Sequence, residues 1–252
     1  MSEDHVLLAF DTSSSLGSVA LARGSEVLAL GWLTDARQHA SQLVPEIAAS
    51  LGRSGLDREE IRGVVVGQGP GSFTGLRVAA ATAKGLSRSF GVPLWHHSSL
   101  AAAAASEGAH VPESVMNRRG GLHALSVDTA EAPRYVLFDA RSDRVYAACY
   151  QILNEGILCL IEPTATTVSR VLSEPIPAGS QFVGEGALRH ASAIEESGHA
   201  VLPFPAGIPT AEGLLCAHRL FAEIEPAQTG SWEPEYLRDF AAAAPEPLGR
   251  RE

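Results

Sequence analysis

A run of three strand-like segments joined by two short turns occurs twice in the chain, and this repetition restricts its possible folds most strongly. The first copy lies within residues 5–33 and the second within residues 135–161. Strands separated by such short turns form antiparallel meanders. Two meanders in a chain of 252 residues indicate a duplicated α/β fold with two lobes.

Helical segments follow the first meander. Apolar residues recur four positions apart at Leu43 and Ile47, which predicts a helix over residues 37–51. A short apolar strand at 61–67 then leads through a Gly-rich turn into a second helix over 74–90. The resulting order, βββαβα, is typical of one half of the actin/Hsp70-like nucleotide-binding fold.

The region between the two meanders is rich in glycine and proline and has little periodicity. Residues 106–133 are therefore expected to form an inter-lobe loop or linker. We assign residues 1–105 to the first lobe, residues 134–240 to the second lobe and residues 241–252 to a frayed tail. A helix capped by its first residue is expected from Thr210 to Ile224.

Charge, cysteine content and hydropathy exclude several classes of protein. The formal net charge of −10 gives the chain no electrostatic reason to bind a nucleic-acid backbone by itself. The three cysteines form no CxxC pair, so neither a disulfide framework nor a zinc site is indicated. The acidic first residues do not resemble a signal peptide, and no apolar run approaches the ~20 residues that span a bilayer. We expect a cytoplasmic protein without membrane contact.

The most distinctive segment is the Gly-rich stretch from Gly67 to Arg77. Glycines ahead of a helix can present backbone N–H groups to an anion. This stretch nevertheless fits no phosphate-binding template, because it lacks the lysine of a P-loop and the third glycine of a dinucleotide fingerprint. A tight strand-to-helix turn, in which glycines permit positive φ and close packing, is favoured over a ligand site. The central residues of this turn are Gly69, Pro70, Gly71, Ser72, Phe73, Thr74 and Gly75.

The turn after the first strand of each meander occupies the place where the actin/Hsp70-like fold binds phosphate. Asp11 and Thr12 begin the first turn, whereas the second begins with Asp139 and contains no glycine. The two-sided phosphate clamp is therefore incomplete, and no bound cofactor is expected. Gly184 and Gly186 could form a remnant of an adenosine-contacting turn. An active ATPase or small-molecule kinase stays open as an alternative.

The first predicted helix carries an isolated histidine. Two histidines four residues apart on a helix bind a metal from one face. Here His39 is followed by Leu43, so the second ligand is missing. A single helix histidine is more often a packed or capping residue, and no metal site is expected. A metallopeptidase is the third hypothesis, and it would require bound zinc.

Taken together, these segments resemble the TsaB (YeaZ) family, accessory subunits of bacterial tRNA threonylcarbamoyladenosine biosynthesis. The motif GPGSFTGLR followed by ATAKGL is highly specific to this family, and the second half of the chain supplies an independent match. The stretch 106–133 is longer than the connection usual in the family. The matching segments are 7–21, 37–47, 64–94, 97–104, 138–150, 183–187 and 234–240.

The resemblance implies a two-lobed actin-like ATPase (ASKHA) fold with a reduced, degenerate second lobe. It also implies a catalytically inactive relative of TsaD, the subunit that transfers the threonylcarbamoyl group. TsaD-like proteins carry a metal-binding HxxxH that this chain lacks at Leu43, and the name peptidase M22 meets the same objection. Family members bind TsaD through two helices of the first lobe, the same face can form homodimers, and the ATPase TsaE joins the complex.

Carried over to this chain, the contact face lies on the helices over 37–51 and 74–90. Small residues on the second helix would allow close approach of a partner helix, although the same stripes could pack on their own sheet. The expected function is that of a non-catalytic partner of TsaD in the complex that forms N6-threonylcarbamoyladenosine at position 37 of tRNAs, with tRNA contacted only indirectly. The candidate interface residues are His39, Leu43, Glu46, Ile47, Arg77, Val78, Ala81 and Lys84.

Overall fold

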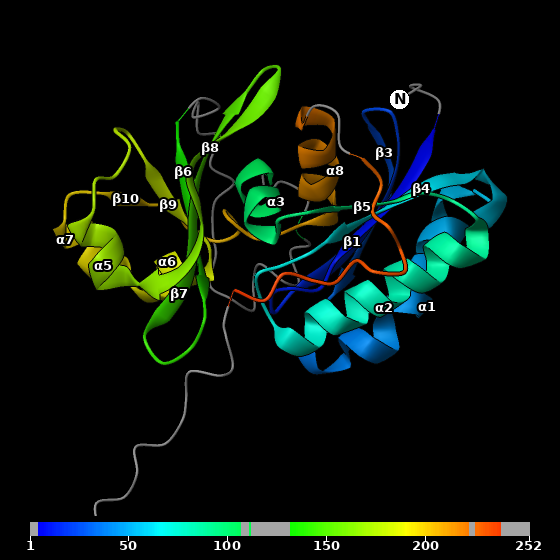
Figure 1. Ribbon diagram of the computed structural model, residues 1–252, viewed down its shortest axis with the longest axis horizontal. Coiled ribbons are helices and arrows are strands. Elements are labelled where there is room, and N and C mark those ends of the chain that lie inside the picture. Colours follow the sequence, from blue (N-terminus) through cyan, green and yellow to red (C-terminus); the bar gives the residue numbers. More distant parts are fainter. Residues whose placement is uncertain (1–4, 107–110, 112–131, 222–224, 238–252) are drawn as a thin grey trace, which may run out of the picture.

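The computed structural model describes residues 5–106, 111, 132–221 and 225–237, which form two lobes side by side (Figure 1). Each lobe is built on a five-stranded mixed sheet. Most of the predicted linker, the end of the predicted helix at 222–224 and the predicted tail lie outside the described residues. No helix in the described part of the chain has the length and apolar character needed to cross a membrane.

The first sheet has the strand order β3-β2-β1-β4-β5. Its three meander strands pair antiparallel, and β4 and β5 continue the sheet in parallel from β1. Two helices, α1 (His39–Ser54) and α2 (Phe73–Phe90), cover one face of this sheet (Figure 1). Short 3-10 turns lie at Ala36–Gln38 and Arg58–Glu60. The strands are β1 (Val6–Asp11), β2 (Gly17–Arg23), β3 (Glu26–Leu33), β4 (Ile61–Gly67) and β5 (Leu94–His97).

The second sheet repeats this order as β8-β7-β6-β9-β10, with the same parallel and antiparallel pairs. Its helices are much shorter. The repetition confirms the predicted two-lobed actin/Hsp70-like fold with a reduced second lobe. The elements are β6 (Arg134–Asp139), β7 (Arg144–Leu153), β8 (Gly156–Thr167), α5 (Val168–Ser173), β9 (Gln181–Val183), α6 (Glu185–Arg189), α7 (Ala191–Glu196) and β10 (Ala200–Val201).

Two helices pack on the lobe opposite to their place in the chain order. Helix α3 (Ser99–Ala105) follows β5 of the first sheet but packs against β6 and β7. Helix α8 (Ala211–Leu220) comes after the second sheet but packs on β1, β2 and β4. Every residue of α3 is buried, because α8 and the second sheet cover it from different sides. The lobe boundaries predicted at residues 105 and 134 divide the chain in sequence order, whereas α3 and α8 each pack on the sheet of the other lobe.

The helix ends follow their capping residues. Helix α2 begins at Phe73 because the Ser72 side chain accepts a hydrogen bond from the Gly75 N–H at 3.3 Å. The predicted cap of α8 is confirmed, since Thr210 accepts from the Gly213 N–H at 2.9 Å. Helix α1 runs through Pro45 without ending there.

Candidate functional site

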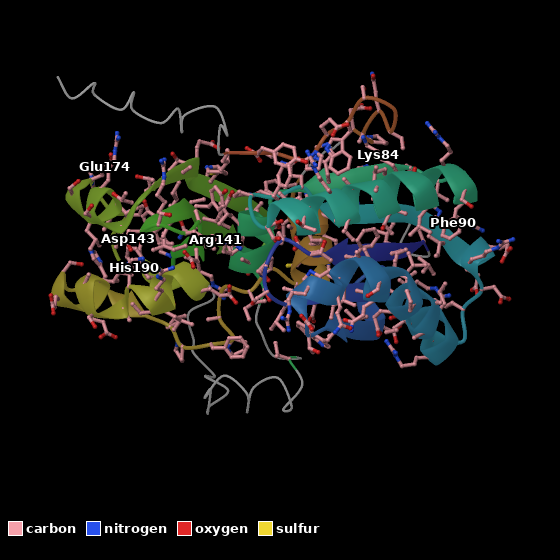
Figure 2. The ribbon with its side chains drawn as sticks, turned by 90° about the horizontal axis from the view of Figure 1, so that it is seen from below. Lys84, Phe90, Arg141, Asp143, Glu174 and His190 are labelled. Atoms are coloured by element: carbon pink, nitrogen blue, oxygen red, sulfur yellow. The ribbon has the colours of Figure 1, made fainter. Side chains whose placement is uncertain are left out.

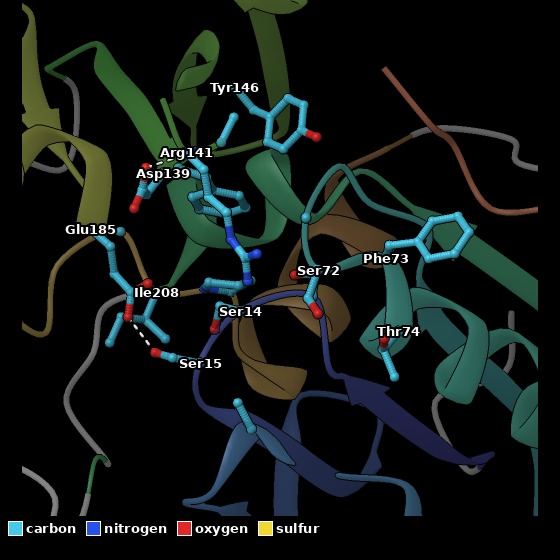
Figure 3. Close-up of a pocket in the computed structure, with 17 residues that line it drawn as sticks. Ser14, Ser15, Ser72, Phe73, Thr74, Asp139, Arg141, Tyr146, Glu185 and Ile208 are labelled. Carbon is cyan, nitrogen blue, oxygen red and sulfur yellow. Dashed lines mark hydrogen bonds between the residues drawn. The ribbon is translucent and has the colours of Figure 1, made fainter. Parts of the chain in front are cut away.

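A cavity of about 470 Å³ lies between the lobes, at the ends of β1 and β6 (Figure 3). Both turns singled out in the sequence contribute to its wall, together with the start of α2. The segment 207–209 also lines the cavity, and no sequence pattern pointed to it. The lining residues are Ser13, Ser14, Ser15, Ala36, Gly71, Ser72, Phe73, Thr74, Phe138, Asp139, Ala140, Arg141, Tyr146, Glu185, Gly207, Ile208 and Pro209.

The carboxylate of Asp11 is buried beneath this cavity and does not line it. One of its oxygens accepts hydrogen bonds from the N–H and the hydroxyl of Ser13, both at 2.6 Å, and the other accepts from the Ser99 hydroxyl at 2.7 Å. Burial raises the pKa of Asp11, although these hydrogen bonds oppose the shift. Thr12 is buried as well and donates from its hydroxyl to the Gly75 carbonyl at 2.7 Å. Both residues therefore hold the turn in place.

The Gly-rich turn packs directly on the end of β1. A Cβ on Gly71 or Gly75 would overlap the backbone of Ser13 or Thr12, and one on Gly67 would overlap the Asp11 carboxylate. These glycines therefore serve close packing, as the sequence favoured.

The other residues of the Gly-rich turn either set its backbone conformation or line the cavity. Gly69 has a φ of 107° and precedes Pro70 through a cis peptide bond. Ser72, Phe73 and Thr74 line the cavity. The motif thus builds one wall of the inter-lobe site as well as the turn beneath it.

The corresponding turn of the second lobe projects an arginine instead of glycines. Asp139 accepts a hydrogen bond from the Arg141 N–H at 2.9 Å and forms an ion pair with Arg189 at 2.8 Å. The Arg141 side chain extends from this turn into the cavity (Figure 3).

The predicted adenosine-contacting remnant is a packing feature in this chain. A Cβ on Gly184 or Gly186 would lie within 2.9 Å of the Leu137 carbonyl oxygen, and neither glycine lines the cavity. The residue between them, Glu185, does line it and accepts a hydrogen bond from the Ser15 hydroxyl across the cleft.

His39 is a packed residue at the start of α1. It is 3% exposed, and burial lowers its pKa, while backbone groups of Leu33 and Thr12 and the charge of Asp35 oppose the shift. Leu43, one turn on, is fully buried. Among the described residues, no group of three or more His, Cys, Asp or Glu side chains is placed to hold a metal ion.

Three of the eight predicted interface residues need correction. His39, Leu43 and Ile47 face the first sheet and are at most 4% exposed, because the apolar stripe of α1 packs into the core of the first lobe. They are therefore not available to a partner on the surface of this chain.

The other five predicted interface residues reach the surface to differing degrees. Ala81 is exposed, and the exposed Arg77 stacks over the Phe73 ring at 3.8 Å. Val78, Glu46 and Lys84 are half-buried. Glu46 forms an ion pair with Arg53 at 2.6 Å, and Lys84 forms one with Glu233 at 3.0 Å. Lys84 is labelled in Figure 2.

Sequence reasoning missed a C-terminal strap, residues 225–237, that returns to the first lobe. Trp232 stacks on His96 with ring centroids 5.1 Å apart, and the Glu235 N–H donates to the Gln68 carbonyl at 2.8 Å. Tyr236 lies 5.3 Å from the Phe73 ring. The only sequence signal for this strap was the segment 234–240, which matches the TsaB family. Residues 238–240 of that segment lie outside the described part of the chain.

Comparisons with known proteins agree with this architecture. The family model for tRNA N6-adenosine threonylcarbamoyltransferase (TsaD) matches residues 34–243. The tRNA threonylcarbamoyladenosine biosynthesis protein TsaB of Escherichia coli K12 is 29% identical over 240 residues, which are 94% of this chain and 96% of that protein. The Bacillus subtilis protein of the same name is 31% identical over 62% of this chain and 59% of its own length.

A solved structure gives the same result. A Pseudomonas aeruginosa protein described as similar to peptidase YeaZ superimposes with a TM-score of 0.72 at 26% identity, covering 93% of this chain and 100% of that one. On this combined evidence, the chain belongs to the TsaD family and, within it, to the TsaB (YeaZ) group.

Proposed function

We propose that this chain is a non-catalytic partner subunit of TsaD in the complex that forms N6-threonylcarbamoyladenosine at position 37 of tRNAs. The TsaB relatives from Escherichia coli and Bacillus subtilis are named for that biosynthesis. The observation that carries the proposal is an exposed face of small residues on α1 and α2, which lie side by side on the outside of the first lobe (Figure 2).

The small residues of this face stand four positions apart on both helices. Ala48 and Gly52 are exposed on α1, and Ala81 and Gly85 are exposed on α2. Residues four apart lie on the same side of a helix, so each pair forms a shallow stripe. Such stripes let a second pair of helices approach closely. Val44, which is 54% exposed beside the α1 stripe, adds apolar area.

The two glycines have no packing role within the described chain. A Cβ added to Gly52 or Gly85 would meet no atom within 4 Å. A glycine inside a helix costs about 0.5–1 kcal/mol relative to alanine, because its unfolded backbone has more freedom to lose. Close approach by a partner backbone is a function that would offset this cost.

The contacts around the inter-lobe cavity support the absence of catalysis. An ATPase or kinase of this fold would need the Asp11 carboxylate to face the cavity, but Ser13 and Ser99 hold it below the surface. Asp139 is engaged by Arg189. A metallopeptidase would need a second histidine where Leu43 fills the core.

We extend the proposal to the larger assembly. The TsaE ATPase would join the complex through TsaD and this subunit, and tRNA would be held by other subunits, since the net charge here is −10. In the absence of TsaD, the same α1–α2 face would form a homodimer. The proposed location is the cytoplasm.

Size-exclusion chromatography with light scattering, on this chain mixed with TsaD of the same organism, tests the proposal. Wild type should form a complex with the summed mass, and Ala81→Leu should abolish it because leucine fills the shallow stripe. Ala193→Leu, an exposed alanine on α7, is the matched control and should leave the complex intact. A complex that survives Ala81→Leu unchanged, or no complex with wild type, would refute the assignment.

A further inference from the structure

A second cavity, of about 510 Å³, lies between the end of β5 in the first lobe and strands β7 and β8 in the second. It shares no lining residue with the cavity at the ends of β1 and β6. Glu162 of β8 and Glu235 of the strap bring two carboxylates to its wall, and no arginine or lysine of the described chain lines it. Negative charge is therefore concentrated in this cavity.

The two carboxylates are not neutralised by the rest of the described chain. Neither of them forms an ion pair with a described residue, although Gln68 donates from Nε2 to a Glu235 oxygen at 3.3 Å. Burial raises the pKa of Glu235, and repulsion by the neighbouring charge of Glu162 adds to the shift. A cation bound beside the two groups would relieve this repulsion.

Uncharged rings form much of the remaining wall. Tyr150 of β7 and Phe221, which follows α8, both line the cavity, and the face of such a ring attracts a cation. His96 and His97 line it as well. Burial lowers the pKa of His96 and lowers that of His97 to about 3, so both imidazoles are neutral at neutral pH and add no opposing charge.

His97 also has a ring nitrogen that is available to a ligand. Its Nε2 shares a hydrogen bond of 2.9 Å with Nδ1 of His218, and its Nδ1 has no hydrogen-bond partner among the residues that the structure describes. When Nε2 donates its proton to His218, Nδ1 becomes an acceptor. His97 is 4% exposed and Tyr150 is 3% exposed, so both are fixed by the fold. A ligand with N–H donors would satisfy the free nitrogen.

We propose that this cavity binds a small aliphatic polyamine, with its ammonium groups at Glu162 and Glu235 and its chain against Tyr150 and Phe221. Two carboxylates on different elements suit a ligand with more than one positive charge, and an ammonium group supplies the N–H donors that His97 can accept. A metal ion fits less well, because no group of three or more His, Cys, Asp or Glu side chains in the described chain is placed to hold one. The cavity volume of about 510 Å³ is within the range of small-molecule sites.

Isothermal titration calorimetry with spermidine, at constant ionic strength, tests the proposal on the chain alone. Wild type should bind, and Glu162→Gln and Glu235→Gln should each bind about tenfold more weakly, as expected for loss of one charge-assisted contact. Glu155→Gln is the matched control, since Glu155 is exposed in the turn before β8 but does not line the cavity. Circular dichroism melts establish that all three variants are folded.

A second arm separates a built polyamine site from general attraction of cations to an acidic chain. Phe221→Leu should weaken spermidine binding about threefold through loss of a ring face, with both carboxylates still in place. Mg²⁺ at the same concentration should not displace spermidine, because it gains nothing from the rings. The proposal fails if wild type does not bind spermidine, if Glu155→Gln weakens binding as much as Glu162→Gln, or if Mg²⁺ displaces the ligand. Since TsaD is absent from this test, its failure would leave the proposed partner role untouched.

Discussion

The two lobes share one strand order but differ in the helices that cover their sheets. In the first lobe, the helix after the meander has 16 residues and the helix after the fourth strand has 18. Their counterparts in the second lobe, α5 and α6, have 6 and 5 residues. A long helix can bury one side on its sheet and still present rows of side chains on the other side. The long helices of the first lobe therefore offer the surface that the proposed docking to TsaD requires, whereas the short helices of the second lobe do not.

The two helices that pack on the sheet of the other lobe, α3 and α8, also differ in the side chains that form the contact. Helix α3 meets the second sheet mainly through leucine and alanine side chains. Helix α8 meets the first sheet partly through histidines, since His97 of β5 and His218 of α8 share a hydrogen bond of 2.9 Å. Burial lowers the pKa of His97 to about 3 and that of His218 to about 4. The α8 contact is therefore the acid-sensitive one.

Lowering the pH should weaken the α8 contact and leave the α3 contact unchanged, and this is the largest effect that we predict. Both histidines have an unfolded pKa of about 6.5 and lower folded values, so the unfolded chain binds more protons below pH 6.5 and the folded state loses stability as the pH falls. At pH 5 the loss is about 2 kcal/mol for each histidine, or about 4 kcal/mol for both. Urea unfolding at pH 7 and pH 5 measures this difference.

The control is His218→Leu, which should lower the stability at pH 7 but reduce the loss between pH 7 and pH 5 by about 2 kcal/mol, the contribution of His218. A variant that loses stability between pH 7 and pH 5 as steeply as wild type would show that other groups cause the effect.

Gly75 in α2 and Gly186 in α6 lie near the start of the helix that follows the fourth strand of each sheet, so substituting them compares the two lobes directly. A Cβ on Gly75 would overlap the Thr12 carbonyl oxygen, whereas one on Gly186 would lie 2.9 Å from the Leu137 carbonyl oxygen. Overpacking of this kind costs roughly 1–3 kcal/mol. Gly75→Ala should therefore lower the free energy of unfolding by about 3 kcal/mol, and Gly186→Ala by about 1 kcal/mol. Equal losses in urea melts would mean that the two turns tolerate a side chain equally well.

The sequence was sufficient to predict the elements whose signals are local. Strand β4 was predicted at its observed bounds, and the two meanders follow from alternating turns and apolar runs. The short elements α6, α7 and β10 were missed, because six residues or fewer carry too little periodicity to stand out. Strand β8 is longer than predicted, since its second half alternates only weakly.

The candidate site was less accessible to sequence reasoning. Periodicity at Leu43 and Ile47 identifies one face of α1, but it does not say whether the covering surface is the chain's own sheet or a partner. The Ser99 hydroxyl that holds Asp11 is 88 residues away in the chain, and only the packing of α3 brings the two together. The orientation of Arg141 depends on three positive φ angles that its residue types do not favour.

The smallest predicted effect concerns Gly85, where stability and docking should respond in opposite directions. An added Cβ meets no atom within 4 Å, so Gly85→Ala should raise the free energy of unfolding of the isolated chain by about 0.5–1 kcal/mol. If a partner helix packs against this position, the same methyl group should weaken the TsaD complex, because the two backbones can no longer approach as closely. Urea melts and titration calorimetry on one variant measure both responses. A stabilised variant that binds TsaD as tightly as wild type would mean that the stripe on α2 does not require glycine, and the docking surface would then have to be centred on α1.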